Sequence, residues 1–260
     1  MNILLTNDDG VFAEGIIKLA KALSRKHAVY ISAPATQQSS VGRKLTLFES
    51  LKAEKVCVEG LPDTEAYAVY GTPVDSMRIG YEEFFRDKNI EMVVSGINLG
   101  ANIGTDVFFS GTANAAHDAS FYGIPALALS CCAREPIHME TSAELSLWAV
   151  DFLQKHPLPE GYYLNVNIPD IKKSAIKGVK MVPLCVQHYT NGFIREEAED
   201  GRYVFKQNYR YITNTMNQDV DGRWIREGYV TVTPVQYDLT SYEYLNMLKK
   251  CCEEEKIWQD

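Results

Sequence analysis

Two patterns of apolar residues alternate along residues 1–160, and this alternation constrains the fold more than any other feature. Short continuous apolar runs, typical of buried strands, are separated by stretches in which apolar residues recur at helical spacing. The expected strands are residues 3–6, 28–33, 66–70, 91–95 and 126–130. The expected helices are residues 15–26, 73–84, 113–123 and 145–152, the last preceded by a capping-box pair, Thr141 and Glu144. The sequence therefore predicts an α/β, Rossmann-like fold with a mostly parallel sheet flanked by helices.

The alternation stops after about residue 160. Further strands are expected at residues 163–168, 177–182 and 229–234, and a last helix at residues 242–252. The segment from about residue 186 to 225 is polar but contains seven aromatic residues: Tyr189, Phe193, Tyr203, Phe205, Tyr209, Tyr211 and Trp224. This composition favours a hairpin or arm over another strand–helix unit.

We therefore expect one domain, residues 1–260, with three parts. Residues 1–160 form the core and carry the active site. A C-terminal β-hairpin arm, from about residue 186 to residue 225, holds protomers together. Residues 241–260 contain the C-terminal helix. Exposed aromatic residues at this density indicate a partner surface. The alternative is a lid that folds over its own active site, since long excursions of this kind are often functional.

The net charge narrows the classes of partner. The chain carries 26 basic and 34 acidic residues, a net charge of −8. A nucleic-acid polymer or an anionic membrane as the main ligand would require a basic surface, so both are excluded. No apolar run approaches the length of a membrane span, there is no basic segment typical of a signal peptide, and the six cysteines include no Cys-x-x-Cys pair. A cytoplasmic protein with reduced cysteines is expected.

Two adjacent carboxylates, Asp8 and Asp9, follow the first expected strand directly. Open α/β folds bind ligands at the carboxyl ends of their parallel strands, which is where this pair would lie. Adjacent carboxylates repel each other unless a positive charge lies between them, and Mg²⁺ or Mn²⁺ prefers such oxygen ligands. The alternative is a turn and helix cap, because Asn-Asp-Asp-Gly is also favourable turn chemistry.

Three more polar loops are expected at the same edge. They contain Ser39 and Ser40, Asn98 and Asn102 among glycines, and Ser110-Gly111-Thr112 at a helix start. Carboxylate, hydroxyl and amide oxygens form a shell for a hard cation, while a glycine-rich backbone and a helix N-terminus suit a phosphate. A metal beside a phosphate indicates phosphoryl chemistry.

Each loop also has a purely structural interpretation. The serines and Thr112 could cap a turn or a helix, and the glycines could only permit loop turns. The sequence has no Gly-x-Gly-x-x-Gly motif and no P-loop lysine. His117 and Asp118 fall inside the following helix, where they are expected to pack or face solvent rather than catalyse.

Taken together, these motifs resemble the SurE (survival protein E) family of metal-dependent 5′/3′-nucleotidases. The resemblance covers nearly the whole chain. It rests on Asn7-Asp8-Asp9-Gly10, Ala33-Pro34 followed by Ser39, Gly71-Thr72-Pro73-Val74-Asp75, Val94-Ser95-Gly96-Ile97-Asn98, Gly100-Ala101-Asn102-Ile103-Gly104, Ser110-Gly111-Thr112, Leu164-Asn165-Val166-Asn167-Ile168-Pro169 and Gly228-Tyr229-Val230-Thr231-Val232-Thr233-Pro234.

The resemblance implies hydrolysis of nucleoside 5′- and 3′-monophosphates, with one Mg²⁺ or Mn²⁺ per subunit and a homodimer or homotetramer. The implied metal ligands are Asp8, Asp9, Ser39 and Asn98, and the first two are also the implied catalytic residues. The implied phosphate contacts are Asn102, Ser110, Gly111 and Thr112. A bulky side chain at position 111 is then expected to weaken phosphate binding and to leave metal affinity nearly unchanged.

The chain departs from the family pattern at two places. The segment around Ser39 reads Gln38-Ser39-Ser40 where Arg-Ser-Gly is usual, and Phe109 stands where tyrosine is common. The first departure bears on substrate preference more than on activity. For the general base, the candidates are Asp9 and a hydroxide on the metal.

Two other functions compete with phosphate hydrolysis. A receiver-like regulatory domain also has an acidic pair after its first strand, but it needs an aspartate where this chain has Asn98, and an asparagine cannot form an aspartyl phosphate. A non-catalytic nucleotide-binding protein would bind nucleotide without a metal. A metal-dependent release of phosphate separates the enzyme from both.

Overall fold

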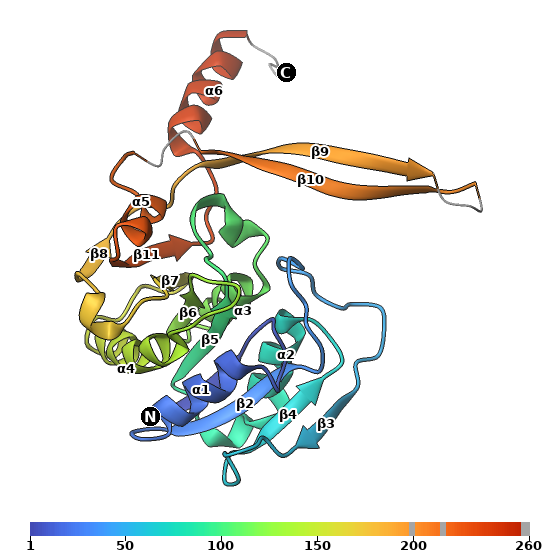
Figure 1. Ribbon diagram of the computed structural model, residues 1–260. Helices are drawn as coiled ribbons and strands as arrows, with labels where there is room; N and C mark the ends of the chain where they lie inside the picture. Colours follow the sequence, from blue (N-terminus) through green and yellow to red (C-terminus); the bar gives the residue numbers. More distant parts are fainter. Residues whose placement is uncertain (198–200, 214–216, 256–260) are drawn as a thin grey trace.

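The computed structural model describes residues 1–197, 201–213 and 217–255. In these residues it shows a nine-stranded sheet covered by helices on both faces, and a two-stranded hairpin that extends away from this body (Figure 1). The strand order is β3-β4-β2-β1-β5-β6-β7-β11-β8. The α/β fold with a mostly parallel sheet and a C-terminal hairpin, predicted from the sequence, is confirmed.

Six strands form the parallel centre of the sheet. They are β1 (Asn2–Thr6), β2 (Ala28–Pro34), β4 (Ala66–Val69), β5 (Met92–Leu99), β6 (Ala126–Cys131) and β7 (Tyr162–Ile168). β3 (Ala53–Val56) and β11 (Val230–Gln236) pair antiparallel with β4 and β7, and β8 (Val179–Met181) pairs parallel with β11. The central strands are almost wholly buried because helices cover both faces.

Two helices cover each face. α1 (Glu14–Leu23) and α4 (Met139–Lys155) pack over one apolar cluster, and α2 (Pro73–Ile79) and α3 (Gly111–Ser120) over the other. α3 carries alanines on its buried side, which allow it to approach the sheet closely. This approach brings the first turn of α3 beside the carboxyl end of β1, where the predicted site lies.

The strands β5 and β3 differ from the sequence-based expectation. β5 continues through Leu99, so it includes the first part of the stretch expected to be a glycine-rich loop. β3 was not expected, because its sequence Ala-Glu-Lys-Val is short and polar. It is an exposed edge strand, and such strands are stabilised by pairing rather than by burial, which leaves no apolar pattern to detect.

α4 begins at Met139, two residues before the predicted capping box, so that prediction was wrong. The distant Asp170 takes over the role of a cap. Its carboxylate accepts hydrogen bonds from the backbone N–H groups of Ile137 (2.8 Å) and His138 (2.7 Å). A contact between residues more than thirty positions apart is invisible to a local capping rule.

β9 (Gln187–Glu197) and β10 (Tyr203–Thr213) form the hairpin, and α6 (Tyr242–Glu255) is the C-terminal helix. α5 (Asp221–Arg226) lies within the body, where Trp224 packs edge-on against Tyr229 at 5.1 Å between ring centroids. The hairpin is thus shorter than the predicted arm of 186–225. The side chains of three aromatic residues predicted for the arm lie outside the described part of the structure: Tyr189, Tyr209 and Tyr211. Among the helices described, none is long and apolar enough to cross a membrane.

Candidate metal and phosphate site

The carboxyl ends of β1, β5, β6 and β7 lie side by side and carry polar residues. Thr6 pairs with Ser95, and Asn98 with Ser130, which in turn pairs with Asn167. Asp8 and Asp9 directly follow β1, so the structure places them at the same edge as Asn98, as parallel pairing requires.

The loop after β1 is held by Asn7. Its buried side chain accepts a hydrogen bond from the N–H of Gly10 (3.1 Å) and donates one to the carbonyl of Gly10 (2.9 Å). Gly10 has φ +109°, a conformation that favours glycine. The turn chemistry considered as an alternative is therefore present, but Asn7 supplies it. Both aspartate side chains are left for another role.

Asp8 is buried against the first turn of α3. It is 4% exposed, and its Oδ1 accepts a hydrogen bond from the hydroxyl of Thr112 at 2.5 Å. A Cβ added to Gly111 would lie 2.8 Å from Cβ of Asp8, so only glycine permits this approach. The pKa of Asp8 is raised to about 6, mainly by burial and also by the negative charge of Asp9, while the hydrogen bond from Thr112 opposes the rise.

Asp9 is less buried than Asp8. Its Oδ2 accepts a hydrogen bond from the N–H of Leu99 (3.2 Å) and its Oδ1 one from Nε2 of Gln37 (3.4 Å). Burial raises the pKa of Asp9 as well. In the part of the chain that the structure describes, no lysine, arginine or histidine forms an ion pair with either carboxylate. The pair is therefore a buried concentration of negative charge without a protein cation.

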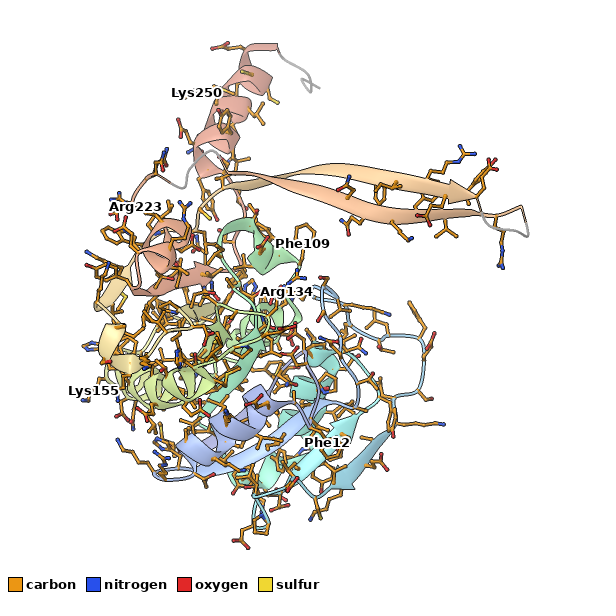
Figure 2. The ribbon with its side chains drawn as sticks, in the orientation of Figure 1. Phe12, Phe109, Arg134, Lys155, Arg223 and Lys250 are labelled. Carbon is orange, nitrogen blue, oxygen red and sulfur yellow. The ribbon has the colours of Figure 1, made fainter. Side chains whose placement is uncertain are left out.

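The loop that carries Ser39 passes from Asp8 to the residues before α3. The N–H of Gln38 donates to the carbonyl of Asp8 (2.7 Å), and the N–H of Gly42 donates to the carbonyl of Phe109 (2.9 Å). Figure 2 labels Phe109 in the loop that precedes α3. Ser39 is exposed between these two attachments. The structure thus brings Ser39 into the same neighbourhood as Asp8.

Asn98 lies near the end of β5 and is partly buried. Its Nδ2 donates to the carbonyl of Gly100 (2.8 Å). The hydrogen bonds described by the structure use no other atom of this side chain, so its acceptor oxygen is the atom left for a cation.

Asn102 is held by side chains from two neighbouring strands. Its carbonyl accepts from Nδ2 of Asn165 (2.7 Å) and of Asn167 (3.0 Å), its N–H donates to Oδ1 of Asn167 (2.9 Å), and its Nδ2 donates to the hydroxyl of Ser130 (2.9 Å). No role was predicted from the sequence for Ser130, Asn165 or Asn167. A signal was present, because two asparagines at alternate positions of an apolar strand point to one face.

Arg134 is another residue that the sequence analysis missed. It is exposed and follows β6, so it comes from the same edge of the sheet (Figure 2). It is a basic residue near an edge of the sheet that otherwise carries carboxylates and amides.

Ser110, Gly111 and Thr112 have separate structural tasks. The hydroxyl of Ser110 accepts a hydrogen bond from the N–H of Ala113 (3.0 Å), so Ser110 is the N-cap of α3, the interpretation considered as an alternative. Gly111 permits the contact with Asp8, and Thr112 holds its carboxylate. The loop predicted to bind phosphate is thus built around the aspartate predicted to bind metal. Its contacts with phosphate stay a prediction.

The donor set suits a hard cation. No group of three or more His, Cys, Asp or Glu side chains able to hold a metal ion occurs among the described residues. A cation here would rely on two carboxylates together with neutral hydroxyl and amide oxygens, the ligands that Mg²⁺ and Mn²⁺ accept alongside water. The buried charge of Asp8 beside the partly buried Asp9, neither paired with a basic side chain among the described residues, is the observation that fits such an ion.

Asp118 and His117, expected to be structural, do pack inside the protein. Asp118 is 1% exposed and forms ion pairs with Arg43 and Arg78, and the ring of His117 stacks on Phe121 at 5.4 Å. All six cysteines are free. Of the cysteines, Cys132 is the one that contacts an amide described above, its Sγ lying 4.0 Å from Oδ1 of Asn167.

The chain is similar to proteins of one family over nearly its whole length. A family model described as "Survival protein SurE" matches residues 3–191. The chain is 37% identical over 257 residues to "5'-nucleotidase SurE" of Clostridium beijerinckii, covering 97% of this chain and 100% of that protein. It is 37% identical over 254 residues to the protein of the same name from Petrotoga mobilis, with 97% and 100% covered. The crystal structure of the SurE protein from Aquifex aeolicus superposes with a TM-score of 0.83 at 33% identity, covering 96% of this chain and 99% of that one.

Proposed function

The chain belongs to the SurE family, and from this premise we propose that it is a metal-dependent phosphomonoesterase, a 5′-nucleotidase that hydrolyses nucleoside monophosphates to nucleoside and phosphate. The family resemblance inferred from the sequence is confirmed. The relatives are named as enzymes, which gives no support to a receiver-like or a purely nucleotide-binding function.

One observation carries the proposal. Asp8 and Asp9 are adjacent carboxylates at the carboxyl edge of the sheet, Asp8 is 4% exposed, and neither has a cationic partner among the described residues. Burying a carboxylate without a counter-charge costs several kcal/mol. A divalent ion removes this penalty, so the site is built for an ion that is not part of the chain.

We assign Asp8, Asp9, Ser39 and Asn98 as the residues that hold one Mg²⁺ or Mn²⁺. The two aspartates would supply the charge, and Ser39 and Asn98 neutral oxygens. A divalent ion bound there would polarise a phosphoryl oxygen and lower the pKa of a coordinated water. Thr112 fixes Asp8 by its hydrogen bond of 2.5 Å, and the N–H of Leu99 fixes Asp9. These bonds keep both carboxylates in place before substrate arrives.

The substrate phosphate would lie at the first turn of α3. The dipole of α3 favours an anion there. Asn102, Ser110, Gly111 and Thr112 are the proposed contacts: Ser110 can donate its O–H because its oxygen accepts from Ala113, and the main chain of Asn102 is held by Asn165 and Asn167. In the reaction, a water oxygen bonds to phosphorus and the bond to the ribose oxygen breaks. Asp9, the more exposed aspartate, is our candidate to accept a proton of the water, and the ribose oxygen takes up a proton as the nucleoside leaves.

Phosphate release tests this proposal. Purified protein is incubated with a panel of nucleoside 5′- and 3′-monophosphates, each with Mg²⁺, with Mn²⁺ or with EDTA. We expect release in the presence of metal and none with EDTA, and recovery when metal is added back in excess. Full activity in EDTA would disprove the metal role. Nucleotide binding without any release under all metal conditions would favour the non-catalytic alternative.

We also propose that the hairpin β9–β10 joins protomers into a homodimer or homotetramer. Five apolar side chains of the hairpin are 44–63% exposed: Phe193, Ile194, Tyr203, Val204 and Phe205. An isolated two-stranded hairpin is marginally stable in water, so such a surface favours a partner. Figure 1 shows the hairpin directed away from the body, which favours an arm over a lid on its own active site.

Light scattering on the intact protein and on a version lacking residues 188–206 tests the arm. We expect a dimer or tetramer for the intact protein and a smaller species after the deletion. The double variant Phe193→Ser, Phe205→Ser tests the same surface without shortening the chain, since these two rings touch at 6.4 Å between centroids. An intact monomer would end the hypothesis, and an unchanged oligomer in both variants would place the interface elsewhere.

A further inference from the structure

The segment that carries Ser39 has no anchor in the hydrophobic core. From residue 36 to residue 52 no side chain is buried, although the flanking strands β2 and β3 are both part of the sheet. Core packing therefore cannot hold Ser39 in one place. Whatever fixes this segment must be a set of polar contacts.

Backbone geometry adds to this requirement. Ser40 has φ +60° and Gly42 has φ +62°, both in the left-handed region. For a non-glycine residue such as Ser40 this conformation is unfavourable and persists only where neighbouring contacts impose it. The segment next to Ser39 is therefore held in a conformation that its own sequence does not prefer.

Arg43 supplies the strongest of these contacts. Its guanidinium pairs with Asp118 at 3.0 Å and lies 4.1 Å from the ring centroid of Phe121. Asp118 is 1% exposed, so the ion pair is screened less than a surface pair. Arg78 binds the same carboxylate through Nε (2.7 Å) and Nη2 (3.0 Å), which orients it toward Arg43.

The anchor lies on the same helix as the metal site. Asp118 is in the last part of α3, while the first turn of α3 holds Asp8 through Thr112. A helix of ten residues is a rigid rod of about 15 Å. Arg43 is fixed to one end of this helix through Asp118, and Asp8 is fixed to the other end through Thr112. Together these two contacts set the position of the segment that carries Ser39.

A second contact holds the segment further along. The side chain of Asp75 at the start of α2 accepts hydrogen bonds from the N–H (3.0 Å) and the hydroxyl (2.8 Å) of Thr46. The hydroxyl of Thr72 donates to the carbonyl of Lys44 (2.7 Å). These contacts hold residues 44–46, so Arg43 is the side chain that ties down the part next to Ser39.

We propose that Arg43 is a positioning residue for metal binding: its ion pair with Asp118 and its contact with Phe121 hold residues 38–42 so that Ser39 stays beside Asp8. This inference rests on the proposed role of Ser39 as a metal ligand. Arg43 touches neither metal nor substrate and acts through the segment. Residues that orient metal ligands in this way typically change metal affinity by about ten- to a hundredfold when they are replaced.

The test compares Arg43→Met with Arg78→Met. Both variants remove one guanidinium from Asp118, but only Arg43 belongs to the Ser39 segment, because Arg78 lies on α2. Mn²⁺ affinity is measured by electron paramagnetic resonance, together with thermal unfolding. We expect Arg43→Met to bind Mn²⁺ about tenfold or more weakly. Arg78→Met is expected to keep the affinity of the natural protein while lowering the unfolding temperature at least as much.

Kinetics separate positioning from damage to the active site. With Arg43→Met we expect the Mn²⁺ concentration for half-maximal phosphate release to rise, while kcat at saturating Mn²⁺ stays within a factor of about three, since the ligands themselves remain. Arg43→Lys keeps the charge but loses the planar fork and the ring contact, so it is expected to recover only part of the affinity.

Proteolysis reports on the segment without any metal. Phe48 is 98% exposed and is a chymotrypsin site within the same loop. We expect faster cleavage after Phe48 in Arg43→Met than in Arg78→Met. Equal Mn²⁺ affinity in Arg43→Met and the natural protein, or equal loss in both variants, would overturn the inference. If the natural protein itself binds no Mn²⁺, the proposed function fails as well, a result distinct from a failure of Arg43 alone.

Discussion

Two buried aspartates at opposite ends of α3 are treated in opposite ways. Asp118, at the end of the helix, is 1% exposed and receives two guanidinium groups, from Arg43 and Arg78. Asp8, beside the first turn, is 4% exposed, receives hydrogen bonds from the hydroxyl and N–H of Thr112 but no guanidinium, and has a second carboxylate, Asp9, as its neighbour. The same helix therefore contacts one carboxylate that is neutralised by arginines, Asp118, and one that is not, Asp8.

The difference teaches how to tell structural from functional charge in this protein. Burial of a carboxylate is costly unless a cation and hydrogen bonds compensate it. At Asp118 the chain provides both, so this site serves the fold. At Asp8 the described residues provide no cation, so burying this carboxylate destabilises the free protein. A bound metal ion would compensate the charge and remove this cost.

The largest expected effect is that of Asp8→Asn on catalysis. Phosphate release should fall by two or more orders of magnitude, because several kcal/mol of metal-centred stabilisation are lost. In EDTA the same variant should be at least as stable to heat as the natural protein, because a neutral amide replaces a buried charge. Phosphate release and thermal unfolding measure both. A variant that retains a tenth of the activity would show that Asp8 does not hold the metal.

The reverse pattern is expected for Asp118→Asn. The free energy of unfolding should fall by about 2 to 3 kcal/mol, because Arg43 and Arg78 lose their common partner. Turnover at saturating metal should change far less than with Asp8→Asn. Asp151→Asn is the matched control: its pair with Lys26 (3.3 Å) is exposed, so its loss should cost less than about 1 kcal/mol. If denaturant titrations give Asp118→Asn and Asp151→Asn the same stability, the ion pairs of Asp118 do not stabilise the fold, and the proposed difference between Asp118 and Asp8 is wrong.

Gly111→Ala tests how closely α3 and Asp8 are joined. The added Cβ would lie 2.8 Å from Cβ of Asp8 and 2.9 Å from Cγ of Pro73, so Asp8 must move. We therefore expect Mn²⁺ and phosphate affinities to fall together, by about tenfold each, the cost of about 1.4 kcal/mol of strain. The sequence alone had led us to expect a loss of phosphate binding only. Calorimetric titration with Mn²⁺ and with phosphate decides between these outcomes, and an unchanged Mn²⁺ affinity would support the earlier expectation.

The smallest effect concerns His117, the neighbour of Asp118 on α3. Burial, aided by the positive charge of Arg43, lowers its pKa from 6.5 to about 4. Between these values the unfolded chain binds a proton that the folded chain does not, so stability falls as the pH drops from 6.5 to 4. His117→Phe should remove this part of the acid sensitivity, at most about 1 kcal/mol because the ring is partly exposed.

Denaturant titrations at several pH values measure this change. His156→Phe, at an exposed position after α4, is the control and should leave the pH dependence as it is. If both variants behave alike, burial of His117 has no part in the acid sensitivity of the protein.

The core elements could be predicted because their signal is local. Each central strand is a continuous apolar run and α1 has one apolar side, so periodicity locates them, while Pro73 marks the start of α2 and a run of alanines marks α3. β3 and α5 escaped prediction for the opposite reason. β3 is a polar edge strand held by pairing with β4, and α5 is a six-residue helix that packs on β11. Neither carries a pattern of its own.

The candidate site shows the same division. Asp8 and Asn98 follow or end predicted strands, so parallel pairing was enough to place them at one edge of the sheet. Ser110 was assigned to phosphate from its position at a helix start, yet its hydroxyl also caps that helix. Residue type and spacing could not separate these two uses, because both need an oxygen beside free N–H groups.

The sequence by itself determined the order of the central strands and of the helices α1 to α4, the acidic pair after the first strand and the membership of a family. Only the tertiary structure decided which charges are compensated. Arg43 meets Asp118 across 75 residues, Asn167 holds Asn102 across 65, and Asp221 accepts a hydrogen bond from Gly104 across 117. Local patterns arise from backbone geometry repeated every few residues, and a sequence displays them directly. Burial and charge compensation arise between segments far apart in the chain, so they exist only once the sheet and α3 have brought those segments together.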